Sequence, residues 1–280
     1  MIMRELIDQL KDLKLAIFDL DGVIYRGIEL IPNTDKIVQE LKDLSIKVIY
    51  NSNNSTVTRH MYVERLNRFN IPSEFSDFYT SASITAAEIT KIKENANIYI
   101  IGDVGIREEL KDLGHSIVTN EKQYDQVDFV IAGLDIKFNY NKLRVAQKCI
   151  IQGHAEFFAT NPDTTIPMPD GLWPGAGVMV NAIQTCTGKA PVKIFGKPEP
   201  FGIKLSLKDF DIQPNQACIF GDRLNTDIVA GNRAKIITVA VLTGVTTREM
   251  IEDLKNRSLK NDEKDILPDI VINSLDEIFK

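Results

Sequence analysis

The sequence predicts an α/β protein: a doubly wound parallel-sheet core with a second, smaller α/β domain inserted into it. Short apolar runs alternate with amphipathic helical patterns in two separate stretches, and the first pattern resumes after the second ends. This alternation is typical of parallel sheets, in which a helix connects successive strands. A chain of 280 residues is also long enough for about two domains of ~150 residues each.

The first series of elements begins near the N-terminus. Apolar residues at helical spacing predict a short amphipathic helix within residues 1–14: Leu6, Ile7, Leu10 and Leu13. The elements expected next are a strand at 15–18, a helix at 34–44 that Thr34 can cap, a strand at 46–50 and a helix at 58–69.

The second series occupies the middle of the chain, and the first then resumes. The middle elements are a strand at 98–101, a helix at 106–113, a strand at 128–131, a helix at 141–151 and a Pro- and Gly-rich loop at 161–177. The later strands are expected at 192–195, 217–220, 236–242 and 270–272. We therefore predict a core of residues 1–82 and 184–280, interrupted by an inserted α/β domain of residues 83–183.

Composition excludes several classes of protein. The formal net charge of −6 argues against a general nucleic-acid binder, which carries a basic field. No apolar run approaches the ~18 residues of a membrane span, and acidic residues near the N-terminus argue against a signal peptide. The three cysteines are widely spaced, which suits a reducing compartment. We expect a cytoplasmic protein.

Polar residues follow several of the expected strands. The carboxyl ends of parallel strands meet at one sheet edge, where ligands bind. Four acids would gather there: Asp19, Asp21, Asp222 and Asp227. Such a cluster repels itself unless it holds a hard cation, and all-oxygen ligands favour Mg²⁺. Lys197 can supply a second positive charge, and Ser52 and Asn53 follow another strand.

These groups are typical of phosphoryl transfer through an aspartyl-phosphate. A carboxylate can attack phosphorus when a metal ion and a lysine screen the charge of both partners. Asp19 and Asp21 are separated by one residue on a turning loop, so one can attack while the other acts as general acid.

Four motifs in the same order resemble those of the haloacid dehalogenase (HAD) superfamily. They are Phe18-Asp19-Leu20-Asp21-Gly22-Val23, Ser52-Asn53-Asn54-Ser55, Gly196-Lys197-Pro198 and Gly221-Asp222-Arg223-Leu224-Asn225-Thr226-Asp227. Two further segments are similar to signatures of the NagD-like, 4-nitrophenylphosphatase branch (subfamily IIA): Ala159-Thr160-Asn161-Pro162-Asp163 and Pro174-Gly175-Ala176-Gly177. The resemblance implies a Rossmann-like HAD core with an inserted cap, and it covers nearly the whole chain.

The resemblance also implies a role for each motif residue. Asp19 would be the nucleophile and Asp21 the general acid and base, its backbone carbonyl touching Mg²⁺. Ser52 and Asn53 would bind phosphoryl oxygens. Lys197 would neutralise the phosphoryl group and orient Asp19. The metal site would include Asp222 as a ligand and Asp227 in the outer shell. The motif that begins with Ser52 usually begins with Thr.

Two other features have plainer interpretations. Gly102-Asp103-Val104-Gly105 lacks the full glycine spacing of a nucleotide fingerprint, so we expect a cap turn with an acid at the helix N-terminus. Trp173 lies in the Gly- and Pro-rich loop, where core-edge packing and substrate contact both remain open.

The sequence thus predicts Mg²⁺-dependent hydrolysis of small phosphate monoesters. Esters of the 4-nitrophenyl, phosphoglycolate, sugar and nucleotide type are all compatible, so the partner is a small phosphorylated metabolite, with no nucleic acid and no membrane. A phosphotransferase or mutase of the same superfamily and a non-catalytic phosphometabolite sensor are the alternatives. A homodimer through the inserted cap is left open.

Overall fold

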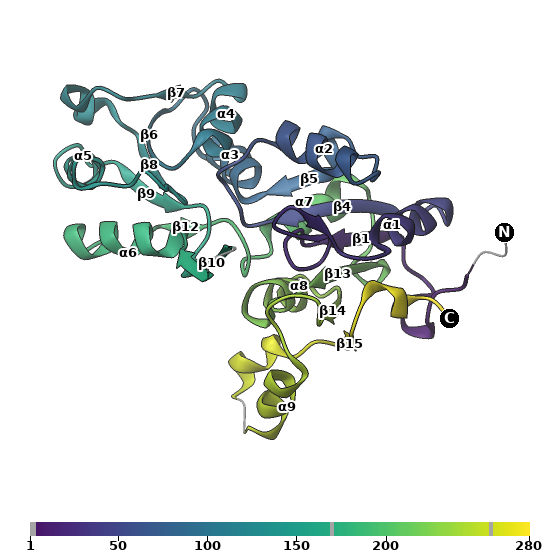
Figure 1. Cartoon of the computed structure of the whole chain (residues 1–280). Coiled ribbons are helices and arrows are strands. Elements are labelled where there is room, and N and C mark those ends of the chain that lie inside the picture. The colour runs from purple at the N-terminus through teal and green to yellow at the C-terminus, as the bar shows by residue number, and fades with distance from the viewer. Residues whose placement is uncertain (1–3, 169–170, 258–259) are drawn as a thin grey trace. The chain divides into compact units, whose positions relative to one another are not determined.

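The computed structural model describes residues 4–168, 171–257 and 260–280, which form two compact units (Figure 1). The first unit contains the chain up to Ser52, Val63–Tyr79 and the chain from Lys197 onward. The second contains Asn53–Tyr62 and Thr80–Gly196. The expected boundaries at 82/83 and 183/184 fall inside two helices, so the second unit starts earlier and ends later than the sequence suggested.

The first unit is built on a six-stranded sheet in the order β15-β14-β13-β1-β4-β5. The pairs β15–β14, β14–β13, β13–β1 and β1–β4 are all parallel. The strands are β1 (Leu15–Phe18), β4 (Lys47–Ser52), β5 (Phe78–Thr80), β13 (Ala217–Gly221), β14 (Ile237–Val241) and β15 (Ile270–Ile272). Every residue of β1 and β13 is buried, as expected for central strands covered on both faces.

Helices and a small hairpin complete the first unit. The helices are α1 (Thr34–Asp43), α2 (Arg59–Arg68, whose first turn belongs to the second unit), α7 (Phe201–Asp209), α8 (Val229–Ala234) and α9 (Arg248–Asn256), and the hairpin pairs β2 (Tyr25–Arg26) with β3 (Glu29–Leu30). In α1 the apolar stripe is buried as its spacing predicts: Ile37, Val38 and Leu41. Its N-cap residue is Asn33 rather than Thr34.

The prediction of a helix within residues 1–14 is wrong for residues 4–14. Residues 1–3 lie outside the described part of the chain. A single 3₁₀ turn forms at Asp8–Leu10. The backbone before it pairs with the other end of the chain: the Ile7 N–H donates to the Ile278 carbonyl at 3.0 Å, and the Lys280 N–H donates to the Glu5 carbonyl at 2.8 Å. This long-range pairing competes with helix formation.

The second unit has its own sheet, in the order β12-β9-β8-β6-β7, with all neighbours parallel. Its strands are β6 (Asn97–Ile101), β7 (Ser116–Ile117), β8 (Phe129–Ala132), β9 (Glu156–Ala159) and β12 (Lys193–Ile194), and its remaining helices are α3 (Ser81–Ile92), α4 (Val104–Asp112), α5 (Tyr140–Ile151) and α6 (Ala176–Thr187). Each unit thus contains a parallel sheet with helices, which confirms the predicted α/β fold class.

The Pro- and Gly-rich segment is not a plain loop. It contains an antiparallel hairpin of β10 (Thr165–Met168) and β11 (Gly171–Pro174), with Ile166 opposite Trp173. Trp173 is 42% exposed on this hairpin. In contrast, the expected cap turn at Asp103 is confirmed, because its carboxylate accepts a hydrogen bond from the Val104 N–H at 2.7 Å.

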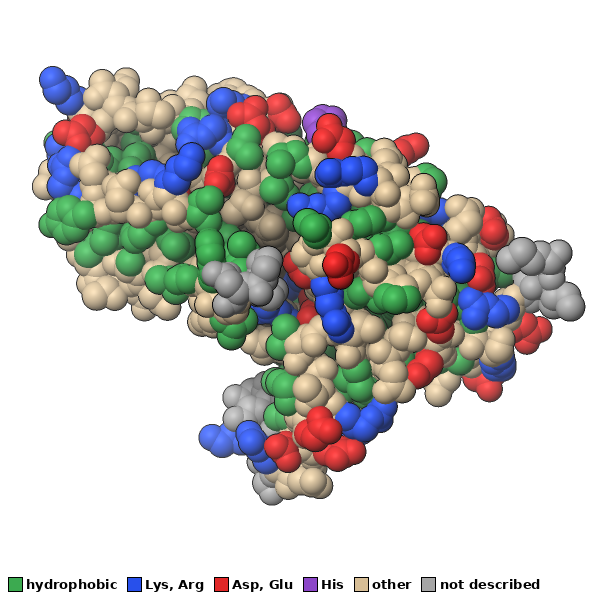
Figure 2. All heavy atoms as spheres, in the orientation of Figure 1, with side chains coloured by type: hydrophobic (Ala, Val, Ile, Leu, Met, Phe, Trp, Pro, Cys, Tyr) green, Lys and Arg blue, Asp and Glu red, His purple; other side chains and the backbone are tan. Residues whose placement is uncertain are grey.

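The described surface carries charged side chains of both signs. Acidic and basic side chains are interspersed on the face that Figure 2 shows, without a broad field of one sign. None of the helices in the described ranges has the length and apolar character that a membrane crossing requires.

Removal of one aromatic ring should test the core of the second unit. Phe158 is 1% exposed and lies 5.5 Å from the Phe129 ring and 5.7 Å from the Phe195 ring. Phe158→Ala should lower the free energy of unfolding by ~3–5 kcal/mol, measured by urea denaturation. Leu172→Ala, at a residue 70% exposed, should change it by less than ~0.5 kcal/mol. Equal unfolding midpoints for the two variants would contradict this packing.

Candidate active site

The candidate site lies at the carboxyl ends of the three adjacent strands β13, β1 and β4. Asp19 follows β1, Ser52 ends β4 and Asp222 follows β13. Strand pairing sets the positions of these residues along the sheet, because Phe18 is in register with both Phe220 and Tyr50. The Asp19 N–H also donates to the Phe220 carbonyl at 2.9 Å. Parallel pairing therefore brings together residues that are far apart in the sequence.

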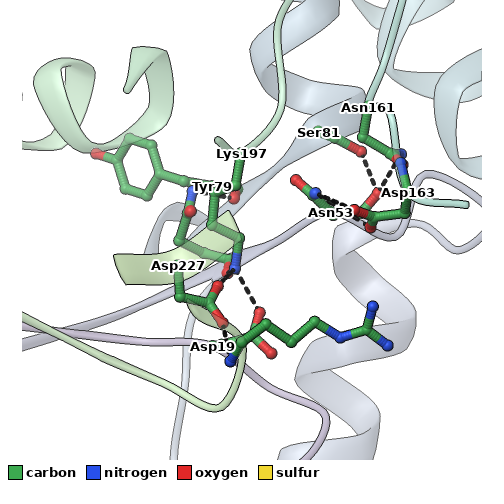
Figure 3. Close-up of polar contacts among 10 residues, drawn as sticks. Asp19, Asn53, Tyr79, Ser81, Asn161, Asp163, Lys197 and Asp227 are labelled. Carbon is green, nitrogen blue, oxygen red and sulfur yellow. Dashed lines mark hydrogen bonds and ion pairs between the residues drawn. The ribbon is translucent and has the colours of Figure 1, made fainter. Parts of the chain in front are cut away.

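The ammonium group of Lys197 joins these strand ends (Figure 3). Its Nζ donates to Asp19 Oδ1 at 2.5 Å and to the Asn51 backbone carbonyl at 2.7 Å. It also forms an ion pair with Asp227 Oδ1 at 2.6 Å. The lysine side chain is only 4% exposed, so both ion pairs are shielded from water. Lys197 thus holds Asp19 and Asp227 together.

Three carboxylates form a group that fits a metal ion. One oxygen from each of Asp19, Asp222 and Asp227 lies within 4.8 Å of the others. Asp222 Oδ2 accepts a hydrogen bond from the Val245 N–H at 2.8 Å, whereas its buried Oδ1 has no hydrogen-bond partner among the described residues. A buried, unsatisfied carboxylate oxygen is costly. Three acids facing one lysine leave excess negative charge, so the oxygen donors fit a small, hard divalent cation.

The pKa values of these carboxyl groups also indicate that a nearby positive charge would be favourable. Burial raises the pKa of Asp19 to about 8, although Lys197 opposes this increase. Burial and the neighbouring Asp227 raise the pKa of Asp222 to about 7. Burial alone would lower the pKa of Lys197, but the charges of Asp19 and Asp227 outweigh it and raise that pKa. Additional positive charge near the carboxylates would favour their ionised forms.

Two glycines leave the space that Asp222 occupies. A Cβ atom at Gly244 would lie 1.9 Å from Asp222 Oδ2, and one at Gly22 would lie 2.4 Å from the same oxygen. Gly22 also has φ +86°, a left-handed conformation that glycine adopts readily. Sequence reasoning missed Gly244 and Val245, which lie shortly after the end of β14 at Val241. Their position after a buried strand at the same sheet edge was the available signal.

Asp21 is not part of the three-carboxylate group. The structure therefore brings together three of the four acids that were expected to cluster. Its side chain is exposed. Nearby protein atoms still desolvate it enough to raise its pKa, while a backbone hydrogen bond from Gly27 and the charges of Arg65 and Arg223 act in the opposite direction. Arg65, which the sequence did not single out, lies 5.1 Å from the centre of the Tyr25 ring. Asp21 is thus accessible and easier to protonate than an ordinary aspartate.

Ser52 and Asn53 are adjacent but lie in different environments. Ser52 is 8% exposed at the end of β4. Asn53 begins the second unit, and its side-chain amide donates to the Asp163 carboxylate at 3.2 and 3.1 Å. No local pattern indicates this pairing across 110 positions.

Two family models match the chain. A haloacid dehalogenase-like hydrolase family matches residues 16–116, and a HAD-hydrolase-like family matches residues 194–278. An acid sugar phosphatase of Staphylococcus epidermidis is 35% identical over 243 residues, which cover 87% of this chain and 92% of that protein. The 5'-nucleotidase YutF of Bacillus subtilis is 34% identical over 244 residues, covering 87% of this chain and 93% of its own.

A solved structure agrees with these relatives. A p-nitrophenyl phosphatase from Archaeoglobus fulgidus matches with a TM-score of 0.85 at 34% identity, covering 95% of this chain and 98% of that one. The chain therefore belongs to the HAD-like hydrolases, in the NagD-like subfamily IIA. The predicted enzyme class, a HAD-type phosphatase, is confirmed.

Cation binding should stabilise the protein more strongly as the pH rises. The pKa of Asp19 is raised in the folded state, so without a cation its contribution to stability is full below about pH 4 and is lost as the pH rises through about 8. A cation held by the ionised carboxylates would reverse this loss. The Mg²⁺-induced increase in Tm, measured by thermal unfolding, should therefore grow between about pH 5 and about pH 8.

A neutral variant of Asp222 provides the control. Asp222→Asn removes one candidate ligand with little change in volume, and most of the Mg²⁺-induced increase in Tm should disappear at every pH. An unchanged increase in this variant, or an increase that shrinks with rising pH, would contradict cation binding at the three carboxylates.

Proposed function

We propose that the enzyme hydrolyses small phosphate monoesters in a Mg²⁺-dependent reaction that passes through a phosphorylated Asp19. The observation that carries this proposal is the buried Lys197 ammonium held between Asp19 and Asp227, beside an Asp222 oxygen that has no hydrogen-bond partner within the described part of the chain. This arrangement keeps a potential nucleophile next to fixed positive charge.

In the first step, a carboxylate oxygen of Asp19 attacks phosphorus and the bond from phosphorus to the ester oxygen breaks. Asp21 gives its proton to the departing oxygen. Its exposed side chain and raised pKa suit this role. Lys197 neutralises charge on the transferring phosphoryl group, and Ser52 and Asn53 bind phosphoryl oxygens. The products are the free alcohol and phospho-Asp19.

In the second step, water attacks the phosphorus of phospho-Asp19 while Asp21 accepts a proton from that water. The bond between phosphorus and the Asp19 oxygen breaks, and inorganic phosphate leaves with the Asp19 carboxylate restored. The carboxylates of Asp19, Asp222 and Asp227 and the backbone carbonyl of Asp21 are the groups that would hold Mg²⁺. When bound, Mg²⁺ screens the negative charges of the phosphate and the nucleophile.

The substrate is a small phosphorylated metabolite. Relatives are named for sugar phosphates, 5'-nucleotides and p-nitrophenyl phosphate, and we extend these ester classes to this chain. The second unit acts as the cap, which selects the alcohol part of the ester. The cysteines are free, in keeping with a cytoplasmic location.

Replacement of the proposed nucleophile should abolish turnover. Asp19→Asn keeps the size of the side chain but removes the attacking charge, so release of 4-nitrophenol from 4-nitrophenyl phosphate with Mg²⁺ should fall at least ~10³-fold. Chelation of Mg²⁺ should abolish wild-type turnover, and added Mg²⁺ should restore it. Asp211→Asn changes an exposed aspartate at φ 52°, a conformation that Asn tolerates, and should leave turnover intact. Substantial turnover by purified Asp19→Asn would exclude the phospho-aspartate pathway.

Replacement of Asp21 should separate the two steps. Nitrophenolate is a stable leaving group and needs little protonation, whereas the alkoxide of a glycerol ester needs a proton as it departs. Asp21→Asn should therefore release a burst of nitrophenol followed by a slow phase, because water attack still lacks its base. With glycerol phosphate, the first step itself should be slow and no burst should appear. Rapid-mixing kinetics decide the point, and equal loss in the first step for both esters would remove Asp21 from acid–base catalysis.

A further inference from the structure

A set of polar side chains in the second unit fixes the residue that directly follows Ser52. The Asn53 carbonyl accepts hydrogen bonds from Ser81 Oγ at 2.6 Å and from Asn161 Nδ2 at 2.7 Å. The Asn53 amide in turn donates to both carboxylate oxygens of Asp163 (Figure 3). We call Asn53, Ser81, Asn161 and Asp163 the asparagine cluster. Backbone and side chain of Asn53 are therefore both held.

The two donors to the Asn53 carbonyl are buried, and the orientation of one of them is fixed by further hydrogen bonds. Ser81 is 0% and Asn161 is 3% exposed. The orientation of the Asn161 amide is fixed from both ends, because its Oδ1 accepts from the Asp163 N–H at 3.1 Å and its Nδ2 also donates to Thr160 Oγ1 at 3.1 Å. Loss of a donor here would leave a buried carbonyl short of a partner, which costs more than loss of an exposed hydrogen bond.

The cluster also lies where the chain passes from one unit to the other. Asn53 is the first residue after Ser52, and Ser81 is the second after Tyr79. At a third crossing, Gly196 precedes Lys197, and its N–H donates to the carbonyl of Thr160, the neighbour of Asn161, at 2.7 Å. Two of these crossings lead directly to proposed phosphate-handling residues, Ser52 and Lys197.

We propose that Ser81 and Asn161 are positioning residues for phosphate binding. They hold the carbonyl of Asn53, in the peptide that joins it to Asn54, and so fix the backbone of Asn53 next to Ser52, where phosphoryl oxygens would bind. Neither residue contacts substrate. This inference rests on the proposed function, because it takes Ser52 and Asn53 as phosphate ligands. A segment that is already held in place avoids the loss of conformational freedom that a mobile segment would suffer when phosphate binds.

Two serines in α3 provide a matched comparison. Ser81→Ala removes one of the two donors to the Asn53 carbonyl. Ser83→Ala removes the same hydroxyl two residues later, where it accepts from the Thr80 N–H at 3.0 Å in the local helix cap. Affinity for inorganic phosphate in the presence of Mg²⁺, measured by titration calorimetry, should fall about three- to tenfold in Ser81→Ala, the range expected for one lost hydrogen bond, and should stay at the wild-type value in Ser83→Ala.

A second pair of variants tests the other donor. Asn161→Ala should weaken phosphate binding by a similar factor, whereas Asn139→Ala removes an asparagine that caps α5 by accepting from the Lys142 N–H at 3.1 Å, and should lower Tm only. Because Ser81 and Asn161 donate to one carbonyl oxygen, their effects on phosphate affinity should be non-additive in the double variant. The loss in kcat/KM should be equal for 4-nitrophenyl phosphate and glycerol phosphate, because the esters share the phosphoryl group.

The outcomes separate this inference from the proposed function. Equal phosphate affinity in Ser81→Ala and Ser83→Ala, with wild-type turnover of 4-nitrophenyl phosphate intact, would overturn the positioning role and leave the proposed function standing. Unequal losses for the two esters would also overturn it, because the cluster would then act on the alcohol part. A wild-type chain that neither binds phosphate nor hydrolyses esters would instead overturn the proposed function, and this inference with it.

Discussion

The ion pairs of Lys197 are the interaction on which the site depends. The lysine is 4% exposed and its ammonium group contacts Asp19 and Asp227 at 2.5 and 2.6 Å. Without that charge, three carboxylates within 4.8 Å of one another would face mutual repulsion in a largely water-free environment. Even with the lysine present, burial and repulsion raise the pKa of Asp19 to about 8. The lysine therefore makes the acid group compatible with a folded core, and it keeps Asp19 closer to the ionised state that attack on phosphorus requires.

The parallel sheet makes this interaction possible. Because β1 lies between β13 and β4 and all three run the same way, one edge collects Asp19, Asp222 and the Asn51 carbonyl that also accepts from Lys197. Buried apolar strands hold the edge rigidly, as the Phe18 and Phe220 rings stack 4.7 Å apart directly beneath it. Space is the second requirement. Gly22 and Gly244 leave room for the Asp222 carboxylate, and the Val245 N–H fixes one of its oxygens.

Local patterns predicted the strands and most residues of this edge, because a buried strand followed by a polar residue is a signal within a few positions. Long-range contacts could not be predicted in this way. Glu5 and Ile7 pair with the C-terminal segment, which replaces the expected N-terminal helix. The Asn53–Asp163 contact spans 110 positions and depends on how β9 continues beyond its carboxyl end. The hairpin at β10 and β11 was missed because Pro and Gly are typical of loops, although consecutive residues of two short strands lie opposite one another there.

Asp19 and Asp21 illustrate how environment, rather than residue type, divides the proposed chemistry. Asp19 is largely buried and paired to a lysine in a group of three carboxylates, so its environment suits a metal-screened nucleophile. Asp21, two positions later, lies outside that group, with an exposed side chain and a raised pKa. The turn at Gly22, with φ +86°, follows immediately, and the Gly22 N–H donates to the Tyr25 carbonyl at 2.7 Å. Two aspartates two positions apart therefore have different surroundings, which suits one to act as nucleophile and the other as proton donor.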